Sequence, residues 1–344
     1  MTNAVAISQY GSSNPTMRNR IINGAMVINQ RGFSGTAVDA TYSLDRWALT
    51  STQASKYTVS QSSTAPTGFT NSILATSSSA YSVSSSDYFS INQFIEGFNT
   101  ADLGWGTATA KAVTLSFWVQ SSLTGTFGGA IVNSAVSYSY PFSYSIPVAN
   151  TWTQISITIA GPTSGTWVGA TNGVGMRIYF SLGAGTSQSG SAGSWASAFY
   201  TSATGAVSVV GTSGATFYFT GVQLEAGSTA TPFEYRQYGT ELSLCQRYYQ
   251  KSGFGMCGRA ESSTLATLTG KYIVEMRSAP TATLLNGSSA VVTFGVSGYD
   301  VSSLSTVTNS TNDFRQAFNV VSGMTTGNIV NGYNSNVLGW SAEL

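Results

Sequence analysis

Aromatic side chains in turn-rich segments are the residues of this sequence whose chemistry points most directly to a ligand. Tyr138, Tyr140 and Tyr144 alternate with small residues, an arrangement that lines one face of an extended segment with rings. Such rings can stack on sugars, but aromatic residues also dominate protein cores and subunit interfaces, so each ring has a structural alternative. The predicted ligand-binding residues are Tyr138, Tyr140, Tyr144, Trp152 and Trp167.

Composition excludes catalysis that depends on histidine. The 344 residues include no histidine, which removes Ser-His-Asp and Cys-His activation and histidine metal ligation. Two cysteines, Cys245 and Cys257, are too few for a disulfide framework, and we expect free thiols. The chain has no Asp-rich loop of the EF-hand type. We predict no catalytic residue and no cofactor, and the sequence leaves a metal ion undecided.

The distribution of carboxylates bears on glycan hydrolysis, which is the main enzymatic alternative to a binding function. Between residues 103 and 224 the charged side chains are Lys111 and Arg177, so this stretch has no carboxylate. Glycoside hydrolysis normally uses two carboxylates that flank the bond, and the sequence shows no fixed-period repeat of a long β-helix. We therefore expect a protein that is not an enzyme, with polysaccharide degradation as a lesser alternative.

Charge is scarce in this chain. Charged residues make up 8% of the sequence, and 14 basic against 13 acidic residues give a net charge of +1. This balance argues against nucleic acid and anionic membranes as partners. No apolar run approaches the ~20 residues that span a bilayer, and the first residues do not resemble a signal peptide. So little charge favours association, which indicates permanent assembly.

Alternation with a period of two organises most of the chain into expected strands. Val113, Leu115, Phe117 and Val119 alternate with polar residues, as do Ile155, Ile157 and Ile159. Further expected strands cover 44–50, 56–61, 72–75, 88–95, 176–182 and 217–224, and 183–215 is expected to be a long loop or loose hairpin. The fold class predicted is all-β, a jelly-roll β-sandwich followed by a second, smaller β domain.

The predicted domain boundaries follow from these patterns. We expect an anchoring arm at 1–20, the jelly-roll domain at 21–225, a linker with a short helix at 226–252, and a C-terminal β domain at 253–344. Thr240 is a candidate cap for that helix, followed by Glu241 in its first turn. Strands are expected in the last domain at 271–276, 282–285, 291–294, 314–321 and 328–333.

Three motif blocks resemble a group of tailed-bacteriophage virion proteins of the tail-fibre or receptor-binding type. The blocks are Asn19–Gly32 with Leu44–Trp47, Gly221–Glu225 with Thr231–Arg236 and Cys245–Tyr249, and Val274–Thr281, which looks like a following strand. The resemblance implies a jelly roll similar to carbohydrate-binding modules and a trimeric assembly within a virus particle, and it transfers no ligand residues. The motif residues singled out as structural are Arg20, Asp45, Arg46, Trp47, Gln223, Glu225, Arg247 and Tyr248. We expect an ion pair between Arg46 and Glu225, because terminal strands of a jelly roll can run close together.

These expectations combine into one functional hypothesis. The chain is expected to be a structural virion protein, a homotrimeric tail fibre or receptor-binding protein that contacts a neutral host-surface glycan. The arm at 1–20 would bind other tail or baseplate proteins, and the protein would be assembled in the host cytoplasm and reside in the virion tail. The alternative is a head fibre or capsid decoration protein, and a bacterial surface adhesin is weaker because no secretion signal is seen.

Overall fold

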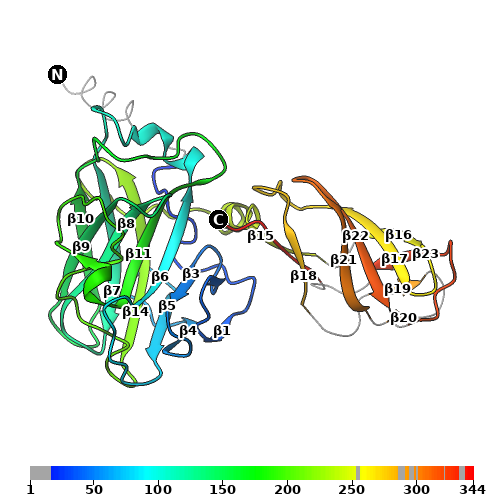
Figure 1. Ribbon diagram of the computed structural model, residues 1–344, viewed down its shortest axis with the longest axis horizontal. Coiled ribbons are helices and arrows are strands. Elements are labelled where there is room, and N and C mark those ends of the chain that lie inside the picture. The colour runs from blue at the N-terminus through cyan, green and yellow to red at the C-terminus, as the bar shows by residue number, and fades with distance from the viewer. Residues whose placement is uncertain are drawn as a thin grey trace. The chain divides into compact units, whose positions relative to one another are not determined.

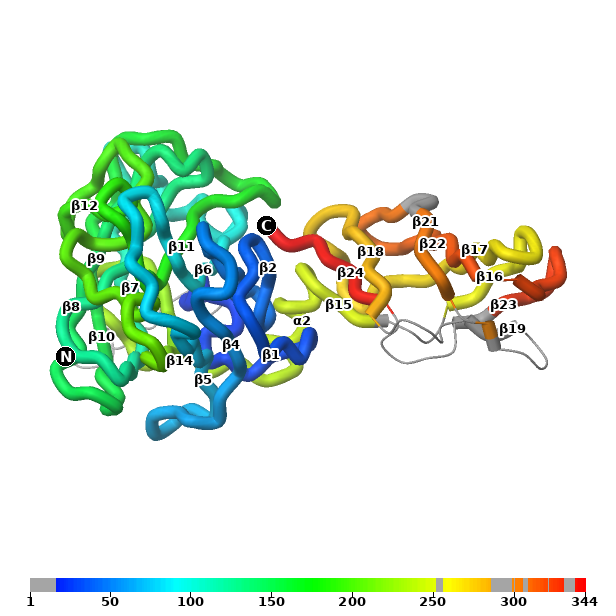
Figure 2. Tube along the Cα trace, turned by 60° about the horizontal axis from the view of Figure 1, so that its bottom comes forward, coloured from blue at the N-terminus to red at the C-terminus, as the bar shows by residue number. Residues whose placement is uncertain are grey.

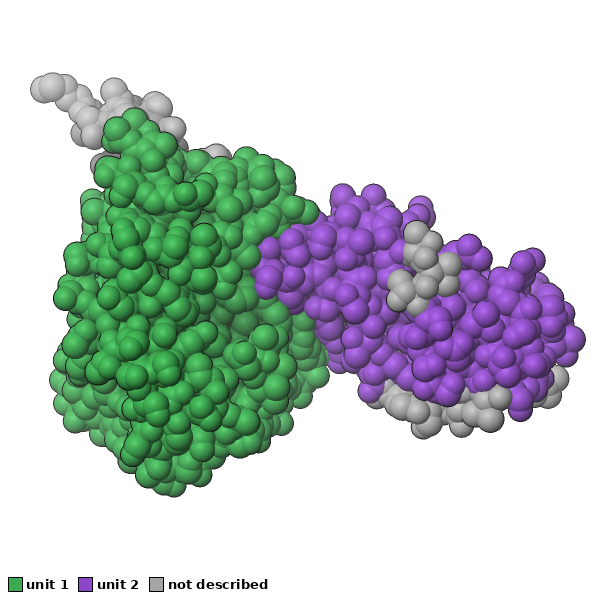
Figure 3. All heavy atoms as spheres, in the orientation of Figure 1, with its two compact units in different colours: residues 1–236 green, residues 237–344 purple. Residues whose placement is uncertain are grey.

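The computed structural model describes residues 17–252, 256–285, 291–293, 298–299, 301–320, 322–332 and 338–344. The chain forms two compact units, residues 1–236 and 237–344 (Figure 3). No helix among the described residues is long and apolar enough to cross a membrane. The boundary divides the predicted linker, because residues up to Arg236 belong to the first unit and Gln237 begins the second.

The first unit is a sandwich of two six-stranded antiparallel sheets (Figure 1). Along the chain, single strands or adjacent pairs of strands alternate between the sheets, and the late strand β14 runs between β5 and β7 (Figure 2), which is the wrapping of a jelly roll. Sheet A has the order β1 (Ser34–Thr36), β4 (Tyr57–Ser62), β5 (Ser72–Ser77), β14 (Thr216–Ala226), β7 (Val113–Ser121), β10 (Thr153–Ile159). Sheet B has the order β2 (Thr41–Tyr42), β3 (Ala48–Ser51), β6 (Tyr88–Glu96), β11 (Val174–Ala184), β8 (Gly125–Asn133), β9 (Ser139–Ile146).

The predicted alternation places apolar residues between the sheets. Leu115 of β7 faces Ile157 of β10 across the strand pair, and Phe117 faces Ile155. Trp47, Phe180 and Phe219 meet in the middle of the core, with ring centroids 4.6–6.0 Å apart. The expected strands of this unit are confirmed apart from residues 44–47, which form a turn before β3, whereas β1, β2, β8 and β9 were not predicted.

Short elements and loops lie outside the two sheets. They include the 3-10 helices η1 (Gly97–Asn99), η2 (Ala101–Leu103) and η3 (Thr186–Gln188), and the paired short strands β12 (Ser189–Gly190) and β13 (Ser202–Ala203). The segment 196–203 lies on the outer face of sheet B, where the Phe199 ring packs against Ala130, Val132 and Tyr179. The expected loop at 183–215 therefore serves as a cover for part of that face.

The first two motif blocks come together at the end of β14. Asn19 donates from its side chain to the Val222 carbonyl (3.0 Å), and its side-chain oxygen accepts from the Leu224 N–H (3.1 Å). The Asn19 N–H donates to the Glu234 carboxylate (2.7 Å), and Arg236 donates to the Asn19 and Ile21 carbonyls. Hydrogen bonds over more than 200 residues of sequence thus close the sandwich.

This arrangement corrects two predictions. Residues 1–16 of the predicted arm lie outside the described residues, but Asn19 is buried and the Arg20 N–H donates to the Leu224 carbonyl at 2.9 Å, so positions 19 and 20 belong to the sandwich. The expected Arg46–Glu225 pair is also wrong. Arg46 donates to the Phe94 carbonyl, whereas Glu225 accepts from Thr231 and lies 4.0 Å from Arg18. The β14 register turns Glu225 outward, toward the returning segment at 231–236.

The other motif residues fix the first turns of the chain. The Asp45 carboxylate accepts from the backbone and side-chain N–H groups of Gln30, each at 2.6 Å. The Trp47 indole N–H donates to the Asn23 carbonyl at 3.1 Å, and the Asn23 side chain donates to the Asp45 carbonyl at 3.0 Å. These contacts hold Trp47 in the core, where the side chain is fully buried.

The second unit contains the helix α2 (Tyr238–Gln246), which begins before the predicted cap at Thr240. Its core gathers Trp340, Phe314 and Tyr272, with centroids 4.4–5.4 Å apart. A three-stranded sheet has the order β15 (Tyr249–Ser252), β24 (Leu338–Ser341), β18 (Thr281–Leu284). A seven-stranded sheet has the order β20 (Gly298–Tyr299), β19 (Val291–Thr293), β23 (Ile329–Gly332), β16 (Cys257–Ala260), β17 (Leu265–Lys271), β22 (Asp313–Val320), β21 (Val301–Asn309).

One strand predicted for the second unit is wrong. Residues 272–276 follow β17 and are not a strand, and the third motif block precedes β18 rather than forming it. Side-chain bonds hold this segment instead, since Gln250 donates to the Val274 carbonyl (2.5 Å) and Arg277 donates to the Ala342 carbonyl (2.7 Å). Arg247 accepts the Arg277 N–H through its carbonyl (2.8 Å), and Tyr248 is buried. Both cysteines are free thiols, as expected.

Candidate ligand-binding surfaces

The predicted ligand-binding residues occupy three different environments. Tyr138, Tyr140 and Trp167 meet in one aromatic cluster, Trp152 lies on the outer face of sheet A, and Tyr144 lies in the sandwich core. The five residues therefore do not form one surface.

Tyr144 is a correction to the predicted site. Its ring packs between Phe117 and Phe127 with centroids 5.1 and 6.1 Å away, and the side chain is 6% exposed. Burial raises the pKa of its hydroxyl, and that hydroxyl has no hydrogen-bond partner among the described residues. Strand β9 turns its even-numbered residues inward, so Tyr144 shares the core with Phe142 and Ile146.

The tryptophan cluster comprises Trp105, Trp167, Trp195, Tyr138 and Tyr140. Its three indoles meet edge to face with centroids 4.8–5.4 Å apart, and Tyr138 stacks on Trp195 at 5.5 Å with an angle of 5°. Every indole N–H is already used by a backbone carbonyl, Trp105 with Lys111, Trp167 with Ser164 and Trp195 with Ala160. The cluster has the geometry of a small core that joins four loop segments.

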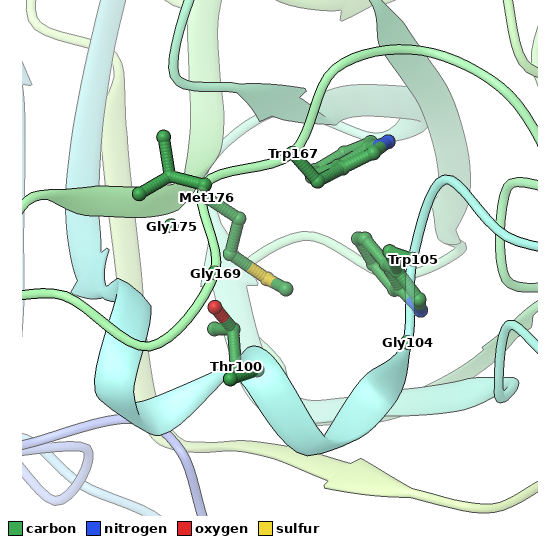
Figure 4. Close-up of a pocket in the computed structure, with 9 residues that line it drawn as sticks. Thr100, Gly104, Trp105, Trp167, Gly169, Gly175 and Met176 are labelled. Carbon is green, nitrogen blue, oxygen red and sulfur yellow. The ribbon is translucent and has the colours of Figure 1, made fainter.

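A pocket adjoins this cluster (Figure 4). Trp105 and Trp167 form one side, and Thr100 and Met176 form the other, with backbone of Gly104, Gly169 and Gly175 completing the wall. Its volume of about 50 Å³ lies well below the ~300–1,000 Å³ of ligand pockets. The pocket is too small for a sugar ring.

The outer face of sheet A carries a second set of rings, which we call the aromatic patch: Trp118, Gln120, Trp152, Gln154 and Tyr218. In the strand register Tyr218 of β14 lies opposite Gln120 of β7, and Trp118 lies opposite Gln154 of β10. The Trp152 and Tyr218 rings are 6.2 Å apart at an angle of 67°. All three rings are half-buried, so part of each ring is open to solvent.

The patch combines rings with amides and hydroxyls and has no charge of its own. Its neighbours on the same face are Thr220, which lies opposite Trp118, and Ser116 and Ser156, which face each other. The side-chain oxygen of Gln120 and the hydroxyl of Thr220 are buried and have no hydrogen-bond partner in the described part of the chain. The side-chain amides that can hydrogen-bond to a hydroxyl-rich ligand belong to Gln154, which is exposed, and Gln120, which is half-buried, while the rings provide apolar contact.

Trp118 and Tyr218 were not among the predicted binding residues, although the sequence contained a signal for Trp118. In the strand at 113–121 the apolar residues occupy odd positions, and Thr114, Ser116 and Gln120 occupy even ones. A tryptophan at the even position 118 therefore stands on the polar, outward face. A tryptophan at a polar position of an alternating strand is therefore the sequence pattern that indicates a ring on the solvent-facing side.

Groups that could hold a metal ion are absent from the ranges that the structure describes: no three of His, Cys, Asp and Glu cluster there. The carboxylate carried by the patch strands themselves is Glu225, at the far end of β14 from Tyr218. It is buried and accepts hydrogen bonds from the Thr231 N–H (2.8 Å) and hydroxyl (2.7 Å). The patch therefore offers binding groups rather than an acid and base pair.

Comparisons with known proteins give no family. No protein-family model matches the chain, and no curated protein matches it in sequence. Among solved structures, the enzymatically active domain of bacteriophage CBA120 tailspike protein 4 has 14% identity and a TM-score of 0.35, covering 61% of this chain and 22% of that one. A family 11 carbohydrate-binding module from Clostridium thermocellum has 10% identity and a TM-score of 0.30, covering 57% of this chain and 98% of that one.

Two further solved structures show similarly low identities and TM-scores. A putative sugar-binding protein from Bacteroides thetaiotaomicron has 12% identity and a TM-score of 0.34, covering 61% of this chain and all of that one. An α-L-arabinofuranosidase has a TM-score of 0.35, with 27% of its length covered. The chain thus spans about a quarter of the tailspike and arabinofuranosidase structures. At these scores the similarities carry no argument about ligand or activity, and the fold assignment rests on the strand order.

Proposed function

We propose that this protein is a non-enzymatic virion protein of a tailed bacteriophage whose sandwich binds a neutral glycan at the aromatic patch. The observation that carries the glycan part is the composition of that patch. Trp118, Trp152 and Tyr218 present partly exposed rings beside Gln120 and Gln154, without a charged side chain between them. A ligand with apolar ring faces and neutral hydroxyls complements such a surface.

The virion part of the proposal is supported by how the motif blocks fold. Residues that resemble the phage tail-fibre group, Asn19 and Arg20 in one block and Leu224, Glu234 and Arg236 in the other, hydrogen-bond to each other. The residues that carry the resemblance are therefore neighbours in the folded structure, although they are far apart in the sequence. Assembly as a homotrimer on the tail, with attachment to tail or baseplate proteins through the residues that precede Asn19, is part of the same proposal.

We propose that the protein is not an enzyme because three carboxylates of the first unit are held by hydrogen bonds away from the patch. In the first unit Asp45 is engaged by Gln30, Asp102 by Arg20 and Glu225 by Thr231. None of these three stands among the patch residues. Hydrolysis of a glycosidic bond at the patch would lack the two flanking carboxylates that such reactions normally use.

A glycan microarray probed with the purified full-length chain tests the ligand. We expect neutral glycans to bind and charged glycans without neutral segments not to bind. Bound glycans should be recovered intact, without new reducing ends. Cleavage of a bound glycan would contradict the non-enzymatic proposal, and binding restricted to anionic glycans would contradict the assignment of the ligand.

Multi-angle light scattering at low and high salt tests the assembly. The proposal predicts a mass of three times 35.9 kDa in both conditions. A stable monomer would contradict the trimer and favour the alternative of a capsid decoration protein or head fibre. A map of the virus particle then separates the tail from the head location.

A further inference from the structure

The pocket beside the tryptophan cluster has a buried floor and a partly exposed rim, and we call it the indole pocket (Figure 4). Thr100, Trp105 and Met176 of its lining are buried, whereas Trp167 is half-buried and Gly169 is exposed. The floor is therefore reached from solvent past Trp167 and Gly169. A small group carried by a larger molecule can enter the pocket while the rest of that molecule stays outside.

A β-bulge in β11 shapes one wall of the indole pocket. The register of β11 against β6 shifts between Val174 and Met176, which leaves Gly175 as the extra residue. A Cβ at Gly175 would lie 2.2 Å from the hydroxyl oxygen of Thr100, so any other residue at this position would displace that hydroxyl. The bulge and its glycine thus provide the space in which the Thr100 hydroxyl lies.

The volume of the indole pocket limits the size of the group that it can take. The pocket has about 50 Å³, and a water-sized group needs ~15 Å³ by the same measure, which leaves room for about three non-hydrogen atoms. A sugar ring is too large, and a single methyl group would leave most of the pocket empty. An acetyl group fits, because it consists of a carbonyl carbon, its oxygen and a methyl group.

The lining selects a neutral group with an apolar end and a hydrogen-bond acceptor. None of its nine residues is charged, and the Trp105 and Trp167 rings and the Met176 thioether offer apolar contact. The Thr100 hydroxyl points toward Met176 in Figure 4 and donates to the Gly97 carbonyl at 3.3 Å, longer than the ~2.5–3.0 Å of an ordinary hydroxyl donor. This weakly held hydroxyl can turn to donate to an oxygen in the pocket.

We propose that the indole pocket holds the acetyl group of an acetylated sugar, as a site separate from the aromatic patch. The acetyl methyl contacts the Trp105 and Trp167 rings, and the acetyl oxygen accepts a hydrogen bond from the Thr100 hydroxyl. The sugar ring itself stays at the rim. N-acetylated and O-acetylated sugars share this chemistry. The inference rests on the proposed glycan-binding function and adds a substituent that the glycan carries.

Saturation-transfer NMR and NMR titration of the full-length chain with N-acetylglucosamine, 6-O-acetylglucose and glucose test the proposal. We expect the acetyl methyl protons to receive the largest saturation. At least one acetylated sugar should bind about tenfold more tightly than glucose, as expected for one buried methyl group and one neutral hydrogen bond. The acetylated sugar that binds more tightly identifies whether the acetyl group is carried on nitrogen or on oxygen.

Thr100→Val tests the hydroxyl, because valine keeps the shape of the side chain and removes the donor. It should weaken binding of the acetylated sugar about fivefold. Thr36→Val is the matched control, since it makes the same change at an exposed position of β1, and it should leave the affinity unchanged. Thr100→Val is expected to fold, because the hydrogen bond that it loses is long.

A second variant keeps the test decisive if thermal unfolding shows that Thr100→Val does not fold. Gly169→Leu places a side chain at the rim, where an added Cβ meets no atom within 4 Å, and it should weaken binding by narrowing the entrance. Gly35→Leu is its control, because an added Cβ there also has open space.

Equal affinity for the three sugars, saturation centred on the sugar ring, or unchanged affinity in the folded pocket variant overturns the inference and leaves a pocket that takes only water. If Trp118→Ala abolishes glycan binding while the pocket variants have no effect, the proposed function stands and the indole pocket fails. If the pocket variants abolish binding of the acetylated sugar while Trp118→Ala has no effect, the indole pocket stands and the aromatic patch fails. If no glycan binds at all, both fail.

Discussion

Arg20 and Asp102 form two hydrogen bonds of 2.6 Å each, although 82 residues separate them in the sequence. Arg20 also donates to the Asn99 carbonyl at 2.7 Å. This pair ties the first motif block to the turn that carries η1 and η2. The hydrogen bonds and charge of Arg20 hold the pKa of the Asp102 carboxyl below its ordinary value of 3.8.

The pair predicts an acid-dependent contribution to stability. A lowered pKa means that Asp102 stabilises the fold above the unfolded carboxyl pKa and that this contribution is lost as pH falls through the folded value. Asp102 is half exposed, so we expect Asp102→Asn to lower Tm by only about 2 °C at pH 7. Thermal unfolding of both proteins from pH 7 to about pH 2 should show the two Tm values converging in acid. A constant difference across that range would contradict the pair's role.

Gly221 permits the bulge in β14 that turns the motif residues outward. It has a φ of +63°, and a Cβ there would lie 2.6 Å from the Phe69 ring. We expect Gly221→Ala to cost about 1 kcal/mol more than Gly205→Ala, because overpacking adds to the cost of the left-handed backbone. Gly205 has a φ of +77° and open space around it, which makes it the matched control. Equal losses in denaturant unfolding would show that Phe69 does not confine this position.

Two buried tyrosines should respond in opposite ways to loss of the hydroxyl. Tyr144→Phe removes a buried hydroxyl without a partner, and we expect unchanged or slightly increased stability. Tyr57→Phe removes a hydroxyl that donates to the Thr50 and Ser90 carbonyls at 2.9 and 3.0 Å, and should cost about 1–2 kcal/mol. Denaturant unfolding of both variants checks this. A clear loss of glycan binding with retained stability in Tyr144→Phe would restore Tyr144 as a ligand residue.

Substitutions in the tryptophan cluster should lower stability, whereas substitutions in the aromatic patch should mainly weaken glycan binding. Trp195 contacts Trp105, Trp167, Tyr138 and Tyr140, and we expect Trp195→Ala to cost about 3 kcal/mol. Trp152 contacts Tyr218 and is half-buried, so Trp152→Ala should cost about 1 kcal/mol or less while weakening glycan binding. Unfolding curves and binding measured on both variants test the assignment. The reverse pattern would place the ligand at the tryptophan cluster.

From the sequence, the positions of strands could be predicted better than whether an aromatic ring faces the core or the solvent. Alternation in the strand at 113–121 identified Leu115 and Phe117 as core residues, because apolar and polar residues differ sharply there. In the strand at 139–146 the larger side chains, Tyr140 and Tyr144 among them, alternate with Ser or Pro, and tyrosine suits both core and surface. Phe142 and Ile146 have the same parity as Tyr144, and this was the available signal that the ring points inward.

Long-range partners could not be predicted from the sequence. The expected partner of Glu225 was Arg46, but the register of β14 shifts between Thr220 and Gln223 and presents Glu225 to Thr231 instead. A shift of one position reverses the face of every following side chain, so one irregularity decides the pairing. The aromatic patch depends on the same kind of information, since it joins rings from β7, from β14 and from the residue before β10.

The most direct test of the account is the affinity of the full-length protein for a neutral glycan identified on the array, measured by isothermal titration calorimetry. Trp118→Ala should weaken this binding at least about tenfold, which corresponds to about 1.4 kcal/mol. Phe98→Ala is the control, because it removes an exposed ring (56%) elsewhere on the same unit, and its affinity should match the unmodified protein. Unchanged binding in a folded Trp118→Ala protein would contradict the central claim that the outer face of sheet A is the glycan-binding surface.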